Sequence, residues 1–493
     1  MNAYPIAAPK AGRSLEGLIA PLRAHVADAV AATATVLPRP FDWLADASSN
    51  DLIAESGWLS RSAWAVIAVA LAEAVATSRT ADVRRAAHWF GIELPGDRWE
   101  AVDAALSVPS SRADLCDLLP YLLDTYGRTS RLDVIRDDKL GAARKARKKT
   151  GSFYTPADVV DFMVDIIASP SHLPDHAHEH WLDPACGSGV FLTGALRRRL
   201  SDGQCDEREF ATTRLHGCDI SPQACDFAAF AILSLIARTE RQPLVAWRAV
   251  RANFVALDAT QQSFDDAGAG LRDVLKLGAA PLRLICNPPY ASAGSGATLA
   301  DGFPTRALYL PFVEMAWRVA RGPRDATSLV VPLALGANRS ADHRRCRNAM
   351  AQAGGSWTML FFDRQPNALF GEEAKTRATI ATRRDGPTPA EIRTSGLLKW
   401  TSRQRASIFT EARATSMGQV NISRLVPKLG SGAEAELYKA LDAFRLRSGM
   451  RPEPTKAAAQ DIVGTKLTSD VFVAGTAYNF LNVFRNYPDQ LSW

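Results

Sequence analysis

The spacing of apolar residues changes along this chain of 493 residues and divides it into three parts. Up to residue 140, apolar positions recur every three or four residues, as in 64–71, which predicts a helical N-terminal domain over 1–140. Over 141–385, short apolar runs alternate with helical patterns, the order typical of a doubly wound α/β sheet. Residues 386–493 open with a glycine and two prolines and are predicted to be a linker and a short C-terminal extension.

The predicted strands of the middle part end in polar residues. Strands are predicted at 181–183, 215–220, 245–250 and 281–286, and helices at 157–168, 193–200, 222–237 and, in the C-terminal part, 434–445. Thr155 is the predicted N-cap of the first of these helices, with Pro156 at its first helical position. Ligands of such sheets bind at the carboxyl ends of the strands, so the residues that follow each strand form the candidate site.

The turn after the first predicted strand contains an acid and two glycines. Asp183 ends the strand, and Gly187 and Gly189 allow a ligand to approach the backbone closely. A phosphate-binding loop would carry a lysine or bare helix-terminal amides, whereas this turn offers a carboxylate suited to the cationic amino end of a ligand. Asp219, at the end of the second strand, lies where such folds hold a ribose diol.

The third predicted strand leads to Asn253 and Phe254. The Asn253 amide can accept a hydrogen bond from an adenine amino group, while Phe254 packs on the ring. Asp258 is a nearby competitor for the role of Asn253. These residues extend the candidate nucleotide site to a third strand.

The fourth predicted strand ends on Asn287, which is followed by Pro288, Pro289 and Tyr290. The prolines fix an extended backbone without N–H donors, so the carbonyl groups there can accept hydrogen bonds without competition. The Asn287 amide oxygen can accept from the same amino group, and Tyr290 offers a face on which a base can stack. The pattern is typical of a pocket for a planar amine; a tight turn after a buried strand is the alternative interpretation.

Composition and charge narrow the class of protein. With 47% hydrophobic and 22% charged residues, the chain is an ordinary globular protein rather than a disordered or fibrous one. The net charge of +6 favours a polyanionic partner, and the basic run at 144–149 is expected to be a solvated linker or a phosphate contact. No signal-peptide pattern opens the chain, and Glu73 interrupts the most apolar run, 63–76, so no membrane span is expected.

Cysteines and histidines give no metal-binding pattern. The seven cysteines form no CxxC pair, which indicates reduced, packed thiols in a cytoplasmic protein. Cys286 is interpreted as a packing residue and not as a nucleophile. Four histidines crowd one loop interrupted by proline, where solvated side chains are expected and no metal site is predicted: His172, His176, His178 and His180.

Five segments between Gly151 and Tyr290 match one family in order and spacing: GSFYTPADVVDFMV, WLDPACGSGVFL, GCDISPQA, RANF and LICNPPY. With them the chain resembles the N6-adenine-specific DNA methyltransferases whose cofactor motifs precede the catalytic NPPY motif, as in type I and type IIG restriction-modification systems. Residues 307–316 are similar to the helix that follows the catalytic loop, and 328–332 to the next strand. Asn253 departs from the family pattern, which often has Asp there.

The resemblance implies a Rossmann-like methyltransferase that moves a methyl group from S-adenosyl-L-methionine to the exocyclic amine of a flipped adenine in double-stranded DNA. It assigns catalysis to Asn287, Pro288, Pro289 and Tyr290. It assigns cofactor binding to Tyr154, Thr155, Pro156, Asp183, Ala185, Gly187, Gly189, Asp219, Ile220, Asn253 and Phe254. The extruded base is expected to be held by Tyr290 and by Phe370, for which a core position at a strand end is the alternative.

The resemblance also implies that 141–385 is the catalytic domain. Relatives usually carry a sizeable target-recognition domain where this chain has 386–493, so a specificity or restriction subunit is an expected partner. Two other functions remain open. The chain could methylate a protein glutamine or an RNA base, or it could be a non-catalytic subunit that binds the cofactor and DNA in a phage-defence complex.

Overall fold

The computed structural model describes Thr33 and residues 155–169, 178–202, 206–236, 243–261, 269–290, 297–371, 376–388, 390–405, 407–419 and 425–448. The chain divides into two compact units, which we call the first unit (1–263 with 270–281) and the second unit (264–269 with 282–493). Apart from Thr33, the predicted N-terminal helical domain lies outside the described residues, as does the basic run at 144–149.

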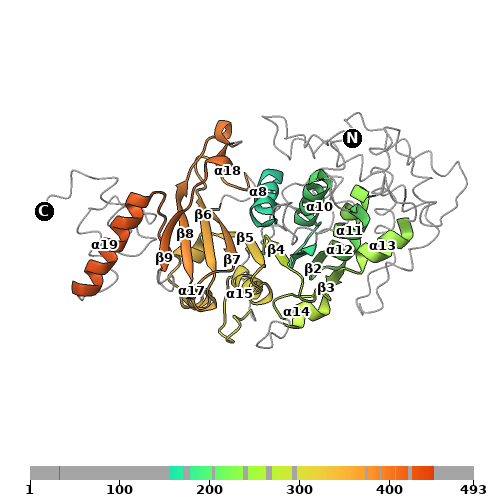
Figure 1. The fold of residues 1–493 in the computed structure, drawn as a ribbon, viewed down its shortest axis with the longest axis horizontal. Helices are drawn as coiled ribbons and strands as arrows, with labels where there is room; N and C mark the ends of the chain where they lie inside the picture. Colours follow the sequence, from blue (N-terminus) through green and yellow to red (C-terminus); the bar gives the residue numbers. More distant parts are fainter. Residues whose placement is uncertain are drawn as a thin grey trace, which may run out of the picture. The chain divides into compact units, whose positions relative to one another are not determined.

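The described part of the first unit contains three parallel strands, β1 (His180–Asp183), β2 (Leu215–Asp219) and β3 (Phe254–Ala256) (Figure 1). β2 pairs with both of the others, so the order is β3-β2-β1. The helices are α8 (Ala157–Ile167), α10 (Val190–Asp202), α11 (Glu207–Thr213), α12 (Pro222–Ile236), α13 (Pro243–Arg251) and, next to the boundary between the units, α14 (Ala269–Val274). Parallel strands joined by helices confirm the predicted doubly wound α/β fold in this unit.

Helix α8 begins at Ala157, the first residue of the predicted range, but its N-cap differs from the prediction. Its N-cap is Pro156, whose carbonyl oxygen accepts from the backbone N–H groups of Val159 and Val160, each at 3.0 Å, and no side chain caps the helix. The prediction of Thr155 as N-cap is therefore wrong; Thr155 is buried instead. The face of the helix that is buried contains Val159, Val160, Met163, Val164 and Ile167.

The prediction of a strand at 245–250 is wrong, because these residues belong to helix α13. Ala246 and Val250, four residues apart, are both fully buried, and Arg251 forms an ion pair with the buried Asp226 of α12 at 2.7 Å. Pro243 stands at the first helical position, where its missing N–H costs nothing. The third strand, β3, follows this helix.

Within the described residues, the second unit contains six strands in the order β4-β5-β7-β6-β8-β9. They are β4 (Leu282–Cys286), β5 (Ala326–Pro332), β6 (Ser356–Phe362), β7 (Ala378–Arg384), β8 (Glu391–Leu398) and β9 (Thr415–Gln419). The helices are α15 (Tyr309–Val319), α16 (Ala334–Ala337), α17 (Ala341–Ala353), the 3₁₀ helix η3 (Ser402–Gln404), α18 (Ile408–Glu411) and α19 (Gly432–Ser448). The predicted helix at 434–445 is confirmed by α19.

The linker predicted from residue 386 onward extends too far. Gly386 and Pro387 do lie in a turn, but β8 begins at Glu391 and pairs with β6 in parallel and with β9 in antiparallel orientation. The carbonyl oxygen of Pro387 accepts a hydrogen bond from the backbone N–H of Gly355, directly before β6, at 2.9 Å. The second unit therefore includes residues that the sequence assigns to a C-terminal extension.

Strand directions bring several loops to one edge of the second unit. β4 runs parallel to β5, β7 runs antiparallel to both β5 and β6, and β8 runs parallel to β6. The carboxyl ends of β4, β5, β6 and β8 therefore share one edge, which we call the second carboxyl edge. The corresponding edge of β1, β2 and β3 is the first carboxyl edge.

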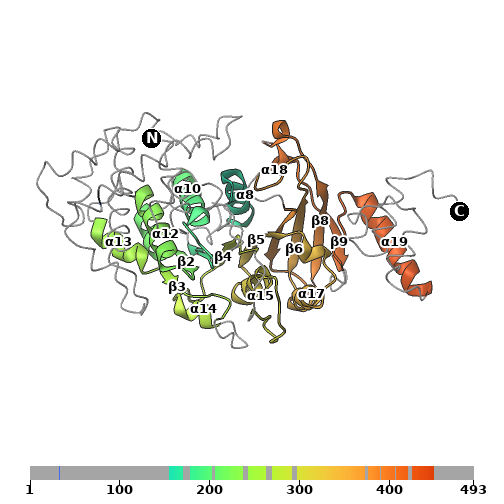
Figure 2. The same cartoon turned by 180° about the vertical axis from the view of Figure 1, so that it is seen from behind.

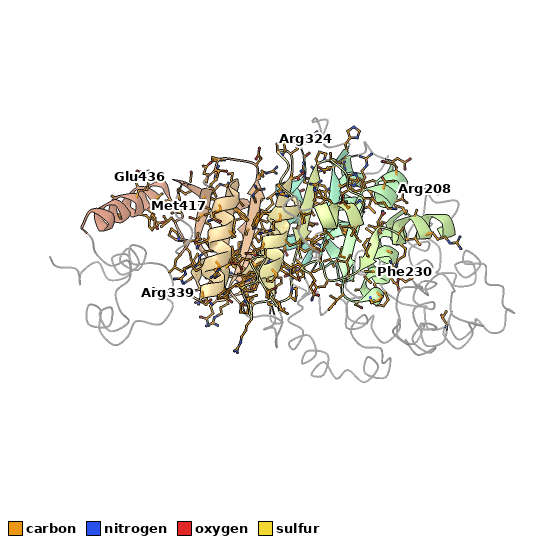
Figure 3. All side chains as sticks on the ribbon, turned by 90° about the horizontal axis from the view of Figure 1, so that it is seen from below. Arg208, Phe230, Arg324, Arg339, Met417 and Glu436 are labelled. Carbon is orange, nitrogen blue, oxygen red and sulfur yellow. The ribbon has the colours of Figure 1, made fainter. Side chains whose placement is uncertain are left out.

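Helices α15 and α17 lie side by side against the sheet of the second unit (Figures 2 and 3). The loops at their ends reach opposite edges of this sheet: Arg324 precedes β5, and Arg339 follows it at the second carboxyl edge. The five cysteines of the described residues are free and buried, as predicted: Cys186, Cys218, Cys225, Cys286 and Cys346. In the part of the chain that the structure describes, no helix is long and apolar enough to cross a membrane.

Candidate active site

The first carboxyl edge is built around Asp219. One of its carboxylate oxygens accepts from the backbone N–H of Gly187 at 3.0 Å, and the other accepts from that of Ser221 at 2.9 Å. Asp183 accepts from the backbone N–H of Ala185 at 3.1 Å. The two acids therefore hold the glycine turn after β1 and the turn after β2 next to each other, as the sequence predicts for a ligand site at strand ends.

Both glycines of the turn are needed for its shape. Gly187 and Gly189 have φ angles of +50° and +82°, a region that other residues rarely adopt. A Cβ atom on Gly189 would also lie 3.0 Å from Cα of Ala228 in helix α12. The turn thus packs its backbone closely against α12, and its two glycines place no side chain at the first carboxyl edge.

Ile220, directly after Asp219, is 78% exposed, which is unusual for a large aliphatic residue. An exposed apolar side chain beside a carboxylate can cover the face of a bound ring while the carboxylate accepts hydrogen bonds. Asp258 follows β3 at the same edge, and the backbone N–H of Leu257 donates to the carbonyl oxygen of Asp219 at 2.9 Å. One oxygen of Asp258 accepts from both the N–H and the hydroxyl of Thr260.

The structure does not bring Asn253 and Phe254 to this cluster. Asn253 precedes β3, its side-chain amide N–H donates to the carbonyl oxygen of Thr212 at 2.7 Å, and its own carbonyl oxygen accepts from Gly217. Phe254 is 1% exposed, and its ring lies where a side chain on Gly217 would be. The prediction that these two residues contact an adenine ring assumed a strand before Asn253, whereas β3 begins after it.

Asn287 to Tyr290 leave β4 at the second carboxyl edge, as predicted. Asn287 is half-buried and Pro288 is buried. The Tyr290 hydroxyl donates to the carbonyl oxygen of Val330 in β5 at 2.9 Å, which fixes the position of the ring. Burial raises the pKa of the Tyr290 phenol well above its usual range, so the hydroxyl remains protonated and keeps this hydrogen bond.

Phe370 lies against Tyr290 although 80 residues separate them in the sequence. The ring centroids are 5.9 Å apart with an angle of 78° between the planes, an edge-to-face contact. Phe370 belongs to the loop between β6 and β7 and is 5% exposed. The structure therefore pairs the two rings that the sequence proposes for the base, but it does not stack them in parallel.

A network of polar side chains holds the segment that follows the NPPY turn. The Tyr309 hydroxyl lies 2.6 Å from Nε2 of His343, whose Nδ1 lies 2.9 Å from Oδ1 of Asp342. The other oxygen of Asp342 accepts from the hydroxyl of Thr305 at 2.8 Å. The pKa of Asp342 is held well below its usual range by the hydrogen bonds of Ser340, His343 and Thr305, which outweigh its partial burial. These contacts join the loop before α15 to α17, and no sequence pattern indicates them.

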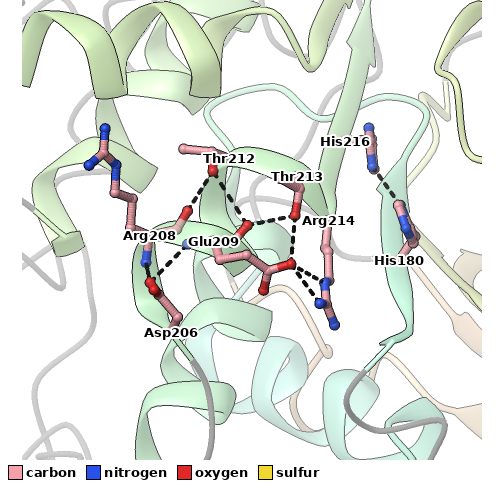
Figure 4. A network of polar contacts seen from close by, with 8 residues as sticks. All are labelled: His180, Asp206, Arg208, Glu209, Thr212, Thr213, Arg214 and His216. Carbon is pink, nitrogen blue, oxygen red and sulfur yellow. Dashed lines mark hydrogen bonds and ion pairs between the residues drawn. The ribbon is translucent and has the colours of Figure 1, made fainter.

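The amino ends of β1 and β2 carry a different polar network (Figure 4). The rings of His180 and His216 stack at 5.1 Å, with Nδ1 of His180 2.9 Å from Nε2 of His216. Arg214 donates to Glu209 at 2.6 Å, next to the pair. Burial lowers the pKa of His216 to about 3, and burial together with Arg214 lowers that of His180, so both rings are neutral near pH 7.

Three residues of the sequence predictions lie outside the described residues: His172 and His176 of the histidine-rich loop, and Tyr154 of the predicted cofactor site. Among the residues that are described, no group of three or more histidine, cysteine or acidic side chains could hold a metal ion. From the sequence, Asp258 is only a competitor of Asn253. The sequence also does not indicate that Arg377 and Lys399 contact Asp363, the residue after β6. A signal for Asp258 exists, since it follows the apolar residues of β3 directly.

Parallel strands with a glycine turn after the first and an acid after the second define a Rossmann-like α/β fold. Residues 141–237 match the model of the family described as N-6 DNA Methylase. The match confirms the resemblance to N6 DNA methyltransferases that the motifs of this part of the chain indicate.

Relatives with known sequence or structure share part of their length with this chain. The Type II restriction enzyme and methyltransferase RM.BcgI of Heyndrickxia coagulans is 25% identical over 150 residues, which are 30% of this chain and 19% of that protein. A chain of the DrdV–DNA complex has 14% identity and a TM-score of 0.49 over 83% of this chain and 45% of its own. A modification subunit of a putative type I restriction enzyme from Vibrio vulnificus has 16% identity and a TM-score of 0.39 over 68% of each chain.

Proposed function

We propose that the protein is a DNA adenine N6-methyltransferase that uses S-adenosyl-L-methionine and acts in a restriction-modification or phage-defence system. The observation that carries the proposal is the Asn287 to Tyr290 turn at the carboxyl end of β4, with Tyr290 anchored to β5 and paired with Phe370. The family match at 141–237 supports DNA as the substrate.

The first carboxyl edge fits S-adenosyl-L-methionine. The open backbone of the turn at Gly187 and Gly189 leaves room for the amino-acid end of the cofactor, and Asp183 supplies a negative charge for its ammonium group. Asp219 is placed to accept from the ribose hydroxyls, and the exposed Ile220 to cover the adenine ring. When bound, the cofactor supplies an electrophilic methyl group on a sulfonium.

Asp258 takes the role that the sequence assigns to Asn253. It follows β3 at the edge where Asp219 ends β2, whereas Asn253 is held by Thr212 before the strand begins. A carboxylate accepts a hydrogen bond from the adenine amino group at least as well as an amide does. The proposal therefore includes Asp258 in the cofactor site and gives Asn253 and Phe254 a structural role.

The NPPY turn would promote the reaction by holding and orienting the target amine. The Asn287 amide oxygen and the Pro288 carbonyl oxygen accept hydrogen bonds from N6, which favours a tetrahedral nitrogen and aims its lone pair at the methyl group. The prolines offer no competing N–H donor. No covalent intermediate is required, in agreement with a buried Cys286 that packs in the core.

An adenine in a duplex cannot present its amine to such a site, so the base must turn out of the helix, at a cost of a few kcal/mol. Stacking on the Tyr290 ring would offset about 1–3 kcal/mol of this cost. Because Phe370 meets Tyr290 edge-on, it would form a side wall of the pocket or rotate when the base enters. Double-stranded DNA is the proposed partner, together with a specificity or restriction subunit in the cytoplasm.

Long-read sequencing of genomic DNA, with and without the gene, would test the function and give the target sequence. We expect N6-methyladenine at one sequence motif when the intact gene is present and its loss with Asn287→Ala. The control is S-adenosyl-L-methionine binding by the purified variant, which should be unchanged because Asn287 is not part of the proposed cofactor site. Methylation that persists in the variant would contradict the proposed role of Asn287.

The main alternative is methylation of a protein glutamine or an RNA base, since NPPY suits any planar amine. Incubation with a labelled methyl donor and separate DNA, RNA and protein fractions distinguishes these substrates. Label in the DNA fraction supports the proposal, and label only in protein or RNA overturns it.

A further inference from the structure

Asp363, the first residue after β6, is contacted by two cationic side chains at the second carboxyl edge. It is buried, and its Oδ1 accepts from Nε of Arg377 at 2.9 Å. The ammonium group of Lys399, which directly follows β8, lies 3.6 Å from Oδ2. The backbone N–H of the neighbouring Arg364 also donates to Oδ1, at 2.8 Å. Three loop ends, after β6, before β7 and after β8, therefore meet at one carboxylate.

The charges at this point do not cancel. Asp363 contributes one negative charge against the three cations Arg364, Arg377 and Lys399. Lys399 is 63% exposed, and the exposed side chain of Arg364 forms no ion pair within the described part of the chain. The buried carboxylate thus fixes two cations in place, and the described side chains around it carry more positive than negative charge. The same loop also contains Glu372, Glu373 and Lys375, which lie outside the described residues.

The same loop carries the base-binding ring. Residues 363–377 connect β6 to β7, and Phe370 in this loop lies against Tyr290. A nucleotide whose base enters between these rings must run its backbone along the surrounding loops. Cations at the ends of the loop that carries this ring, and at the neighbouring end of β8, are suited to phosphates, because guanidinium groups bind phosphate with paired hydrogen bonds.

We propose that Arg364, Arg377 and Lys399 form a contact site for the phosphodiester backbone of the DNA strand that carries the target base. The proposal rests on the proposed function, because it takes DNA as the substrate. It adds a positioning site, which holds the strand while the base is out of the helix. The contact reads no sequence, since phosphates carry none.

The test is DNA binding by the full chain, measured by fluorescence anisotropy of a labelled duplex over a range of salt concentrations. Lys399→Ala and Arg364→Ala are each expected to lower the slope of log affinity against log salt by about 0.9, the value for one lost phosphate contact. KM for DNA should rise in both variants, while kcat and S-adenosyl-L-methionine affinity stay as in the wild type. Lys399→Arg should restore the slope, because it keeps the charge.

Lys439→Ala is the matched control. Lys439 is also an exposed lysine of the second unit with a single carboxylate partner, Glu436 at 2.8 Å, but it lies on α19. Its removal should leave the salt slope unchanged. A slope equal to that of the wild type in both Lys399→Ala and Arg364→Ala, with methylation intact, would overturn the phosphate site and leave the proposed function standing. A wild-type chain that neither binds nor methylates DNA would overturn both.

Discussion

The two carboxyl edges offer opposite chemistry. The first edge presents carboxylates, with one exposed aliphatic side chain among them: Asp183, Asp219, Asp258 and Ile220. The second edge presents an amide, two aromatic rings and a cluster of cations: Asn287, Tyr290, Phe370, Arg364, Arg377 and Lys399. Both units carry polar loops at the carboxyl ends of their strands, so the fold alone does not decide the charge of a site. The few residues after each strand decide it.

The difference matches the two substrates of the proposed reaction. The cofactor has a cationic amino end and hydroxyl donors, which carboxylates bind, whereas DNA brings phosphates and flat bases, which cations and rings bind. If the assignment of the edges is correct, a substitution at one edge should change the affinity for one substrate and leave the other unchanged.

Asn287→Ala should lower the methylation rate by about 100-fold or more, because it removes a hydrogen bond that aims the amine in the transition state. Affinity for S-adenosyl-L-methionine, measured by calorimetry, should not change. Loss of cofactor binding in this variant would show that the two edges are not separate in function.

Tyr290→Ala should weaken catalysis on duplex DNA by about 5- to 150-fold, since stacking contributes about 1–3 kcal/mol. Tyr290→Phe keeps the ring but loses the hydrogen bond to Val330, so a smaller effect is expected. Phe370→Ala should fall between wild type and Tyr290→Ala because Phe370 meets Tyr290 edge-on. Fluorescence of a 2-aminopurine placed at the target position reports how far the base is extruded in each variant.

Asp219→Asn should reduce the affinity for S-adenosyl-L-methionine by about tenfold, the effect of losing charge-assisted hydrogen bonds. An amide keeps one acceptor oxygen for Gly187 or Ser221, so the fold is retained. Salt-dependent DNA binding by the same variant should be that of the wild type.

Asp258→Ala and Asn253→Ala separate the two candidates for the adenine amino group. We expect Asp258→Ala to weaken cofactor binding by a few-fold. Asn253→Ala should instead lower the free energy of unfolding by about 1 kcal/mol, because it removes the hydrogen bond to Thr212, and leave cofactor affinity as it is. The reverse result would return the adenine contact to Asn253.

The smallest effect concerns the amino ends of β1 and β2. His180 and His216 have lowered pKa values in the folded state, His216 to about 3, so the unfolded chain binds more protons below about pH 6.5. Their contribution to stability is present above that pH and declines as the pH falls, by about 1 kcal/mol for His216 at pH 5.5. Thermal unfolding at several pH values should show this decline, and His216→Gln should reduce it.

Short-range patterns in the sequence were sufficient to predict β1, β2 and β4, the strands that are followed by a residue of the candidate site. Asp183, Asp219 and Asn287 each close an apolar run, and each run is a strand. The error at 245–250 arose because Val245, Trp247 and Val250 favour a strand by type, whereas packing against α12 and the pair Asp226–Arg251 stabilise a helix. Asn253 was misplaced as a consequence, because its position depends on where β3 begins.

Long-range contacts were not accessible from the sequence. Phe370 could be named only by resemblance, and the contact with Tyr290 depends on β7 running antiparallel between β5 and β6. Lys399 lies in the region 386–493, which the sequence assigns to a linker and a C-terminal extension because a glycine and two prolines stand at its start. No local pattern relates Asp363 to Arg377 and Lys399, which are brought together by three separate strands.

The loop at 363–377 should restrict which natural sequence changes the protein tolerates. It bears Phe370 near its middle and cations at both ends, Arg364 and Arg377, so its length sets the distance between the ring and the charges. Substitutions in this loop would alter one contact at a time, whereas an insertion or deletion would shift all of them at once. Among natural variants of this protein we therefore expect changes of residue type in the loop to be far more common than changes of its length.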